Sequence, residues 1–159
     1  VSNKDIKIMS TAEMQTAAFP ELEAGADSPD FSRAPLRAGS LKILISDLLF
    51  PGDPKETLRH LMQSQSSILI FTPQDPAESR PTWQGNIEFQ DVETQEVQQQ
   101  FINPDILETY LKAYQRHFEL WRQTATQYGA KISYFDSGIP LLEQLQKGAV
   151  VNQLLEIKQ

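Results

Sequence analysis

The chain has 159 residues, 40% of them apolar and 22% charged, which is ordinary for a soluble globular domain. Its 21 acidic and 14 basic residues argue against a nucleic-acid groove, because phosphate binding requires clustered Lys and Arg. The absence of cysteine excludes disulfides, thiol nucleophiles and thiolate metal sites. With neither a membrane-spanning apolar stretch nor the apolar core of a signal peptide in residues 1–15, the default expectation is a cytoplasmic protein.

Residues 1–40 carry the weakest structural signals. Ile6 to Ile8 suit the end of a strand, and Ala12 to Ala18 suit one or two helical turns. Prolines and glycines punctuate residues 20–40, which we interpret as a long connection. A connection of about twenty residues is unusual inside a compact domain. Together with Val rather than Met at position 1, it favours a processed protein or a fragment whose well-defined part is residues 41–159.

Residues 41–50 are the stretch around which the rest of the chain is organised. They form a short apolar run typical of a strand covered on both faces, as in a parallel sheet flanked by helices. Ser46 and Asp47 stand at its carboxyl end, where ligands bind in such sheets. Asp47 is the best functional candidate, because a carboxylate there can hold a hard cation directly or through water. The alternative interpretation of Asp47 is a helix or loop cap beside Asp53.

A helix and a second strand follow the first strand. Asp53 at the N-cap, Pro54 at the first helical position and Glu56 in a capping box predict a helix start. Ile68 to Phe71 then form a second buried strand. Strand, helix and strand within about thirty residues predict a right-handed parallel crossover. Residues 72–78 are predicted to be a loop at the carboxyl end of this second strand.

Side chains in and after this loop are further candidates. Asp75 and Glu78 can act as a carboxylate pair, although Asp-Pro-Ala-Glu also suits a turn. Trp83 is either a contact point for a partner or a lid over the following hairpin. His60 and His117 are too far apart in sequence to suggest a ligand pair, and we expect each on a helix surface.

The second half of the chain contains the longest predicted helix. Residues 86–102 alternate as in an antiparallel hairpin, with the turn near residues 93–95. Residues 104–128 carry an apolar, largely aromatic stripe at helical spacing, which is more often core than binding surface. Asn103 caps this helix and Gly129 stops it. At roughly 1.5 Å per residue it is about 37 Å long, enough to cross a sheet face and extend beyond it.

The carboxyl-terminal part of the chain contains three shorter predicted elements. They are a third strand over residues 132–135, a helix over residues 140–146 and an amphipathic segment over residues 150–157.

Five motifs, taken together, resemble one bacterial family. In chain order they are Ile45-Ser46-Asp47-Leu48-Leu49, Asp75-Pro76-Ala77-Glu78, Gly85 followed by Asp91-Val92-Glu93-Thr94, Tyr110 in the long helix, and Asp136 with Pro140-Leu141. Over about residues 36–146 they resemble the carboxyl-terminal half of the von Willebrand factor A-like proteins known as domain-of-unknown-function family 58. The resemblance implies a doubly wound, mostly parallel α/β sheet of Rossmann-like type, truncated at the N-terminus and carrying an inserted β-hairpin.

The resemblance also implies a metal-ion-dependent adhesion site and association with MoxR-type AAA+ ATPases. In the parent fold an Asp-x-Ser-x-Ser motif, a Thr and an Asp after the fourth strand hold the metal, and Asp47 matches that last Asp. This chain contains no Asp-x-Ser-x-Ser motif, so either the first half is missing or the site has been lost. Three core strands and a hairpin also leave one sheet edge unpaired, which is a liability that missing strands would remove.

Three functional hypotheses follow. The first is a non-enzymatic module that binds a protein partner, such as a MoxR-type ATPase, through the carboxyl edge of its sheet with Ser46, Asp47, Asp75, Glu78 and Trp83. Asp47 would hold Mg²⁺ there if the missing half supplied the other ligands. The second is a magnesium-dependent hydrolase with Asp47, Asp75 and Glu78 as acids. The third is homodimerisation through the long helix.

Overall fold

The structure is a computed structural model that describes residues 8–16, 29–62, 66–91 and 95–145. In chain order its elements are α1 (Thr11–Gln15), a 3-10 turn (Phe31–Arg33), β1 (Leu41–Ile45), α2 (Pro54–Leu61), β2 (Ser67–Gln74), α3 (Pro76–Ser79), β3 (Gly85–Gln90), β4 (Val97–Ile102), α4 (Pro104–Gln127), β5 (Lys131–Asp136) and α5 (Leu141–Gln144). The strand end predicted at Ile6 and Lys7, most of the hairpin turn and the amphipathic segment over residues 150–157 lie outside the described residues.

The three predicted core strands form one parallel sheet in the order β1-β2-β5. Leu44 pairs with Ile70, and Ile70 pairs with Ile132, so these three side chains point to the same face. The register continues to Asp136, which lies beside Gln74 at the carboxyl end of the sheet. The expectation of an α/β fold with a parallel sheet is therefore confirmed.

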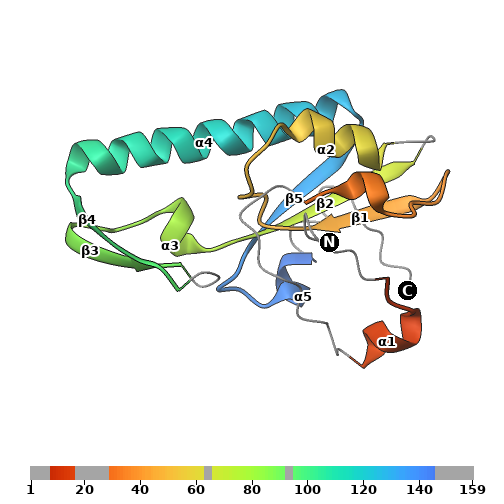
Figure 1. The fold of residues 1–159 in the computed structure, drawn as a ribbon, viewed down its shortest axis with the longest axis horizontal. Coiled ribbons are helices and arrows are strands. Elements are labelled where there is room, and N and C mark those ends of the chain that lie inside the picture. The colour runs from red at the N-terminus through yellow and green to blue at the C-terminus, as the bar shows by residue number, and fades with distance from the viewer. Residues whose placement is uncertain (1–7, 17–28, 63–65, 92–94, 146–159) are drawn as a thin grey trace.

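Two crossovers place the helices above one face of the sheet. Helix α2 connects β1 to β2, and the hairpin with α4 connects β2 to β5. Because both crossovers step in the same direction along the sheet, α2 and α4 lie on the same face, whereas α5 lies on the opposite side (Figure 1). All three carboxyl strand ends therefore face the same edge.

The second strand is longer than the sequence predicts. It continues through Thr72 and Pro73 to Gln74, a stretch expected to be a loop. The reason is the arrangement of its neighbours: β1 ends at Ile45, opposite Phe71, so from Thr72 onward β2 pairs with β5 alone. Pro73, which has no N–H, therefore has a single strand beside it. The rest of the expected loop contains the short helix α3.

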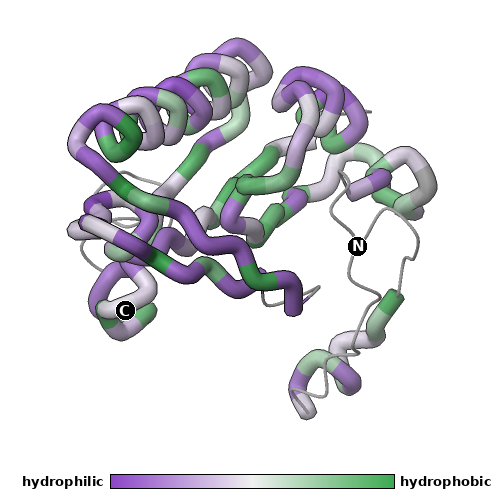
Figure 2. The backbone as a smooth tube through the Cα atoms, turned by 60° about the vertical axis from the view of Figure 1, so that its left-hand side comes forward, coloured by the Kyte–Doolittle hydropathy of each residue, from purple (hydrophilic) through white to green (hydrophobic). Residues whose placement is uncertain are grey.

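The hydrophobic core lies between the sheet and the helices α2 and α4. Its buried members are Phe31, Leu48, Leu58, Leu61, Ile68, Ile70, Phe118, Trp121, Ala125 and Ala130. Figure 2 shows hydrophobic residues concentrated in the strands of the sheet, whereas the middle of β4 is hydrophilic. Trp121 is the largest fully buried side chain, and the ring of Phe50 meets it edge-on at 5.8 Å. This packing is the main source of stability in the fold.

One charged residue in β1 points into the core. Lys42 is 7% exposed, and its ammonium group donates a hydrogen bond to the carbonyl oxygen of Leu61 at the end of α2. The carboxyl end of a helix carries partial negative charge, so this contact compensates the buried cation. It explains how a lysine fits in the middle of an apolar strand.

Helix α4 follows the predicted boundaries. The side chain of Asn103 accepts a hydrogen bond from the backbone N–H of Ile106, Pro104 occupies the first turn, and Gly129 has a φ of +65° just beyond the end. Only the second half of α4 lies over the sheet; the first half extends beyond it above the hairpin and α3 (Figure 1). The expectation that this helix extends past the sheet is confirmed.

The hairpin is antiparallel, as its alternating pattern predicts. Gly85 pairs with Ile102, and Ile87 and Phe89 are half-buried while their neighbours are exposed. Gln95 has a φ of +62°, the left-handed conformation that a glycine adopts most easily. The sequence thus places a strained residue where turns of this type usually have Gly.

The outer edge of β1 is open in the described part of the chain. Strand β1 pairs only with β2 there, and Leu41, Ile43 and Ile45 are 57%, 54% and 71% exposed on the face opposite the core. A groove of about 470 Å³ runs along this edge beside Phe31. The prediction of an unpaired sheet edge holds for the described residues.

Candidate functional site

Three acidic side chains lie near the carboxyl edge of the sheet. Asp47 follows β1, Asp75 follows β2, and Glu78 lies one helical turn later in α3. The pKa of Glu78 is raised, first by partial burial and then by the negative charges of Asp47 and Asp75. The structure therefore places the three acids that the sequence singles out near one edge of the sheet, where the charges of Asp47 and Asp75 act on Glu78.

The two side chains after β1 shape their own loop. The hydroxyl oxygen of Ser46 accepts a hydrogen bond from the N–H of Leu48 at 3.0 Å, and Asp47 accepts one from the N–H of Leu49 at 3.1 Å. These contacts are ST and Asx turns, in which a short polar side chain caps the backbone. The interpretation of Asp47 as a loop cap is confirmed. Ser46 lies on the side of the β1 groove rather than with the acids.

A strained residue fixes the loop in place. Leu48 has a φ of +62° and is fully buried in the core. A bulky residue in the left-handed region costs on the order of 1 kcal/mol or more and persists only where packing enforces it. Nε2 of His117 lies 2.7 Å from the carbonyl oxygen of Leu48, which makes this ring nitrogen the donor. Helix α4 therefore holds the loop that carries Asp47.

His117 lies at a contact between two elements that are distant in the sequence. It was expected on a helix surface, yet it is half-buried and connects α4 to the loop after β1. The signal was present in the helical spacing: positions 110, 114, 117 and 121 advance by four, three and four, which places His117 on the same face as the aromatic stripe.

Asp75 positions Glu78 by capping α3. A carboxylate oxygen of Asp75 accepts a hydrogen bond from the N–H of Ala77 at 2.8 Å, and its carbonyl oxygen accepts one from the N–H of Glu78 at 3.0 Å. The interpretation of this stretch as a fixed turn is confirmed. The hydroxyl of Tyr110 in α4 donates to the carbonyl oxygen of Glu78 at 3.1 Å, which attaches α3 to the long helix.

A cleft of about 560 Å³ lies beside these acids, between α3, β3 and the first half of α4. Its lining residues are Leu49, Glu78, Trp83, Phe89, Tyr110, Ala113, Tyr114 and His117. This volume is within the range of ligand pockets, roughly 300–1,000 Å³. The cleft combines apolar and aromatic walls with one carboxylate.

Trp83 is the centre of the aromatic wall. Its ring lies 5.2 Å from that of Phe89 in β3 and 5.0 Å from that of Tyr110 in α4, and the rings of Tyr110 and Tyr114 lie 5.9 Å apart. These separations are typical of favourable aromatic pairs. Trp83 therefore does cover the hairpin, as one of its two sequence interpretations proposes, and it remains half-exposed in the cleft.

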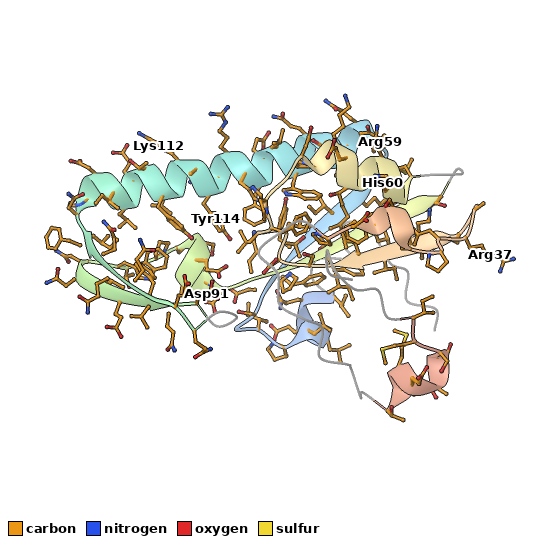
Figure 3. All side chains as sticks on the ribbon, in the orientation of Figure 1. Arg37, Arg59, His60, Asp91, Lys112 and Tyr114 are labelled. Atoms are coloured by element: carbon orange, nitrogen blue, oxygen red, sulfur yellow. The ribbon has the colours of Figure 1, made fainter. Side chains whose placement is uncertain are left out.

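Tyr114 lies deeper in the same cleft. Figure 3 shows it on the side of α4 that faces α3. Burial, followed by the nearby charge of Glu78, raises the pKa of Tyr114 to about 12, so its phenol stays neutral. Its buried hydroxyl has no hydrogen-bond partner among the described residues. An unsatisfied buried hydroxyl is a feature that a bound polar group can satisfy.

Among the described residues, Asp47 is not part of a group of three or more side chains of the metal-ligating types. In this part of the chain no group of three or more His, Cys, Asp or Glu side chains is arranged to hold a metal ion. Asp47 also uses a carboxylate oxygen to cap the N–H of Leu49. Since Mg²⁺ requires octahedral oxygen coordination, Asp47 would need further ligands from outside these residues.

Comparisons of the chain with protein-family models, curated proteins and solved structures find no match. Within the described ranges, no helix combines the length and apolar character needed to cross a membrane.

Proposed function

We propose that this chain is a non-enzymatic protein-interaction module whose binding surface is the cleft between α3, β3 and the first half of α4. The observation that carries the proposal is the half-exposed aromatic cluster of Trp83, Phe89 and Tyr110 beside the carboxylate of Glu78. Trp and Tyr side chains in such positions dominate the binding energy of protein interfaces. The cleft also lies at the carboxyl edge of a parallel sheet, the usual place for ligands in α/β folds.

The von Willebrand A identity is part of this proposal. It is supported by the resemblance, by the parallel order β1-β2-β5 and by the position of Asp47 after β1. In a doubly wound sheet, further strands would pair with the open edge of β1 and place the point of strand reversal beside Asp47. A MoxR-type AAA+ ATPase is the partner that the resemblance implies. Mg²⁺ enters the proposal only if those strands bring oxygen ligands to Asp47.

The test is recovery of a partner from the native cells with the complete protein as bait. We expect a stoichiometric partner with the native sequence and its loss with Trp83→Ala. Glu88→Gln is the matched control, because Glu88 lies on the exposed side of β3 and contacts Gln99 rather than the cleft. Equal recovery with all three baits, or recovery of nothing, would contradict the proposal. Recovery of an ATPase would support the von Willebrand A reading specifically.

A magnesium-dependent hydrolase is the alternative function. The convergence of Asp47, Asp75 and Glu78 favours it, whereas the capping hydrogen bonds of the first two carboxylates weigh against free catalytic acids. The distinguishing measurement is a screen for phosphatase and nuclease turnover with added Mg²⁺. Turnover that disappears in Asp47→Ala would establish the hydrolase, and turnover unchanged by that substitution would eliminate it.

A further inference from the structure

The walls of the cleft are aromatic. Trp83, Tyr110 and Tyr114 form a chain of rings whose neighbouring centroids lie 5.0 and 5.9 Å apart. The face of an aromatic ring carries negative electrostatic potential, and it attracts a cation within about 6 Å of the ring centre. Aromatic rings that line one cleft can bind alkylammonium and guanidinium groups in this way.

The charges around the cleft have one sign. Glu78 lines it, and Asp47 and Asp75 are close enough to Glu78 to raise its pKa. The lining includes no Lys or Arg among the described residues. The nearest cation of α3, Arg80 at its C-cap, is instead paired with Asp136 at 3.2 Å. The cleft thus lacks an internal counter-ion for carboxylates that repel one another.

The unsatisfied hydroxyl of Tyr114 adds an independent observation. It is a buried oxygen beside Glu78, without a partner in the part of the chain that the structure describes. Its neutral phenol can accept a hydrogen bond from an N–H group, which both ammonium and guanidinium supply. The aromatic rings and the acidic rim therefore select the same chemical class, and the hydroxyl oxygen of Tyr114 is compatible with it.

We propose that this cleft binds a cationic side chain, Lys or Arg, presented by the protein partner. The inference rests on the proposed function and names the chemistry of its ligand. The cation lies against the rings of Trp83 and Tyr110, its charge faces Glu78, and its aliphatic stem packs on the apolar wall of the cleft. Acidic or phosphorylated segments are rejected, because Glu78 and its two acidic neighbours repel them.

The test uses short blocked peptides and the full chain. Acetyl-Gly-Gly-Arg-Gly-Gly-amide and its Lys counterpart are titrated against the isotope-labelled protein, with the indole N–H signals observed by NMR. The controls replace Arg by citrulline and Lys by acetyl-lysine, which preserve the approximate shape and remove the charge. We expect the signal of Trp83 to shift with the charged peptides only, and that of the buried Trp121 to stay in place. Equal shifts with the neutral peptides, or no shift of Trp83, would overturn the inference.

Two variants test separately the charge of Glu78 and the ring of Trp83. Glu78→Gln removes the charge and Trp83→Leu removes the ring. Each variant is expected to weaken binding of the charged peptide about threefold to fivefold. Glu88→Gln makes the same change of charge on the exposed face of β3 and is expected to leave the affinity unchanged. Circular dichroism spectra establish that all three variants are folded. If Glu88→Gln weakened binding as much as Glu78→Gln does, the effect would come from the net charge of the protein and not from a site. That result would overturn the inference.

The inference and the proposed function fail in different ways. If a partner is recovered through Trp83 but neutral and charged peptides bind alike, the interaction module stands and the cationic ligand is wrong. If the charged peptides bind as expected and no partner is recovered, the cation site stands and the proposed function is wrong.

Discussion

One apolar stripe runs along both halves of α4, but its side chains are buried to different degrees in the two halves. In the second half, Phe118, Trp121, Thr124 and Ala125 are buried against the sheet. In the first half no residue is fully buried, and Tyr110 there contacts the ring of Trp83 and the backbone of Glu78 in α3. The same periodic pattern therefore produces a core where a sheet lies beneath it, and a cleft where only small elements do. The spacing of apolar residues therefore indicates which face of a helix is covered, but not how deeply that face is buried.

The largest loss of stability is expected from a substitution in the buried second half of α4. Trp121 is 1% exposed, and Trp121→Ala should lower the free energy of unfolding by about 3–5 kcal/mol, because it removes a large side chain and leaves a cavity. Denaturant unfolding measures this change. A loss below about 1 kcal/mol would show that the core does not depend on the second half of α4.

Trp83→Ala is the matched substitution at the cleft end. It removes two aromatic contacts of a half-exposed ring, so we expect a loss of about 1–2 kcal/mol, clearly smaller than for Trp121→Ala. Binding of the charged peptides should decline much more than stability does. If the two Trp substitutions destabilised the chain equally, the cleft would be a second core rather than a surface.

Removing the contact between α4 and the loop after β1 should cause an intermediate loss of stability. His117→Ala leaves the carbonyl oxygen of Leu48 without its donor, and we expect a loss of about 1–2 kcal/mol in the free energy of unfolding. His117→Gln retains an N–H donor and should lose less. Equal losses for both variants would mean that ring packing, not the hydrogen bond, is the source of the stabilisation.

Glu78→Gln should give the smallest effect, and it should be stabilising. The folded-state pKa of Glu78 is raised, so its contribution to stability is present at low pH and is lost as pH rises through that pKa. At pH 7 the charged carboxylate therefore opposes folding, and Gln removes the cost of partly burying its charge, together with its repulsion by Asp47 and Asp75. We expect the melting temperature to rise by at most about 3 °C at pH 7, since the group is largely solvated. The gain should vanish near pH 4; a gain that is independent of pH would contradict this origin.

Local signals predict much of this fold. The N-caps Asp53 and Asn103 and the stop at Gly129 predict the boundaries of α2 and α4, because capping depends on neighbouring residues alone. The apolar runs predict all three strands of the parallel sheet. Parallel strands end at the same edge, and this rule predicts that Asp47 and Asp75 lie at one edge, where both charges act on Glu78.

Contacts between distant elements were not predictable in the same way. The extension of β2 to Gln74 depends on β5, which lies nearly sixty residues later in the chain. The contact of Lys42 with the end of α2 and that of His117 with Leu48 require the tertiary packing of helices on the sheet. The cleft likewise exists only because the hairpin folds beneath α4. No local period or cap contains that information.

The most direct test of this account is the response of the two indole N–H signals to the Arg peptide and to its citrulline counterpart. We expect the Arg peptide to shift the signal of Trp83 and to leave that of Trp121 unchanged, and the citrulline peptide to shift neither. Equal responses to the two peptides, or a response at Trp121 instead of Trp83, would contradict the claim that the first half of α4 forms a binding surface for cations.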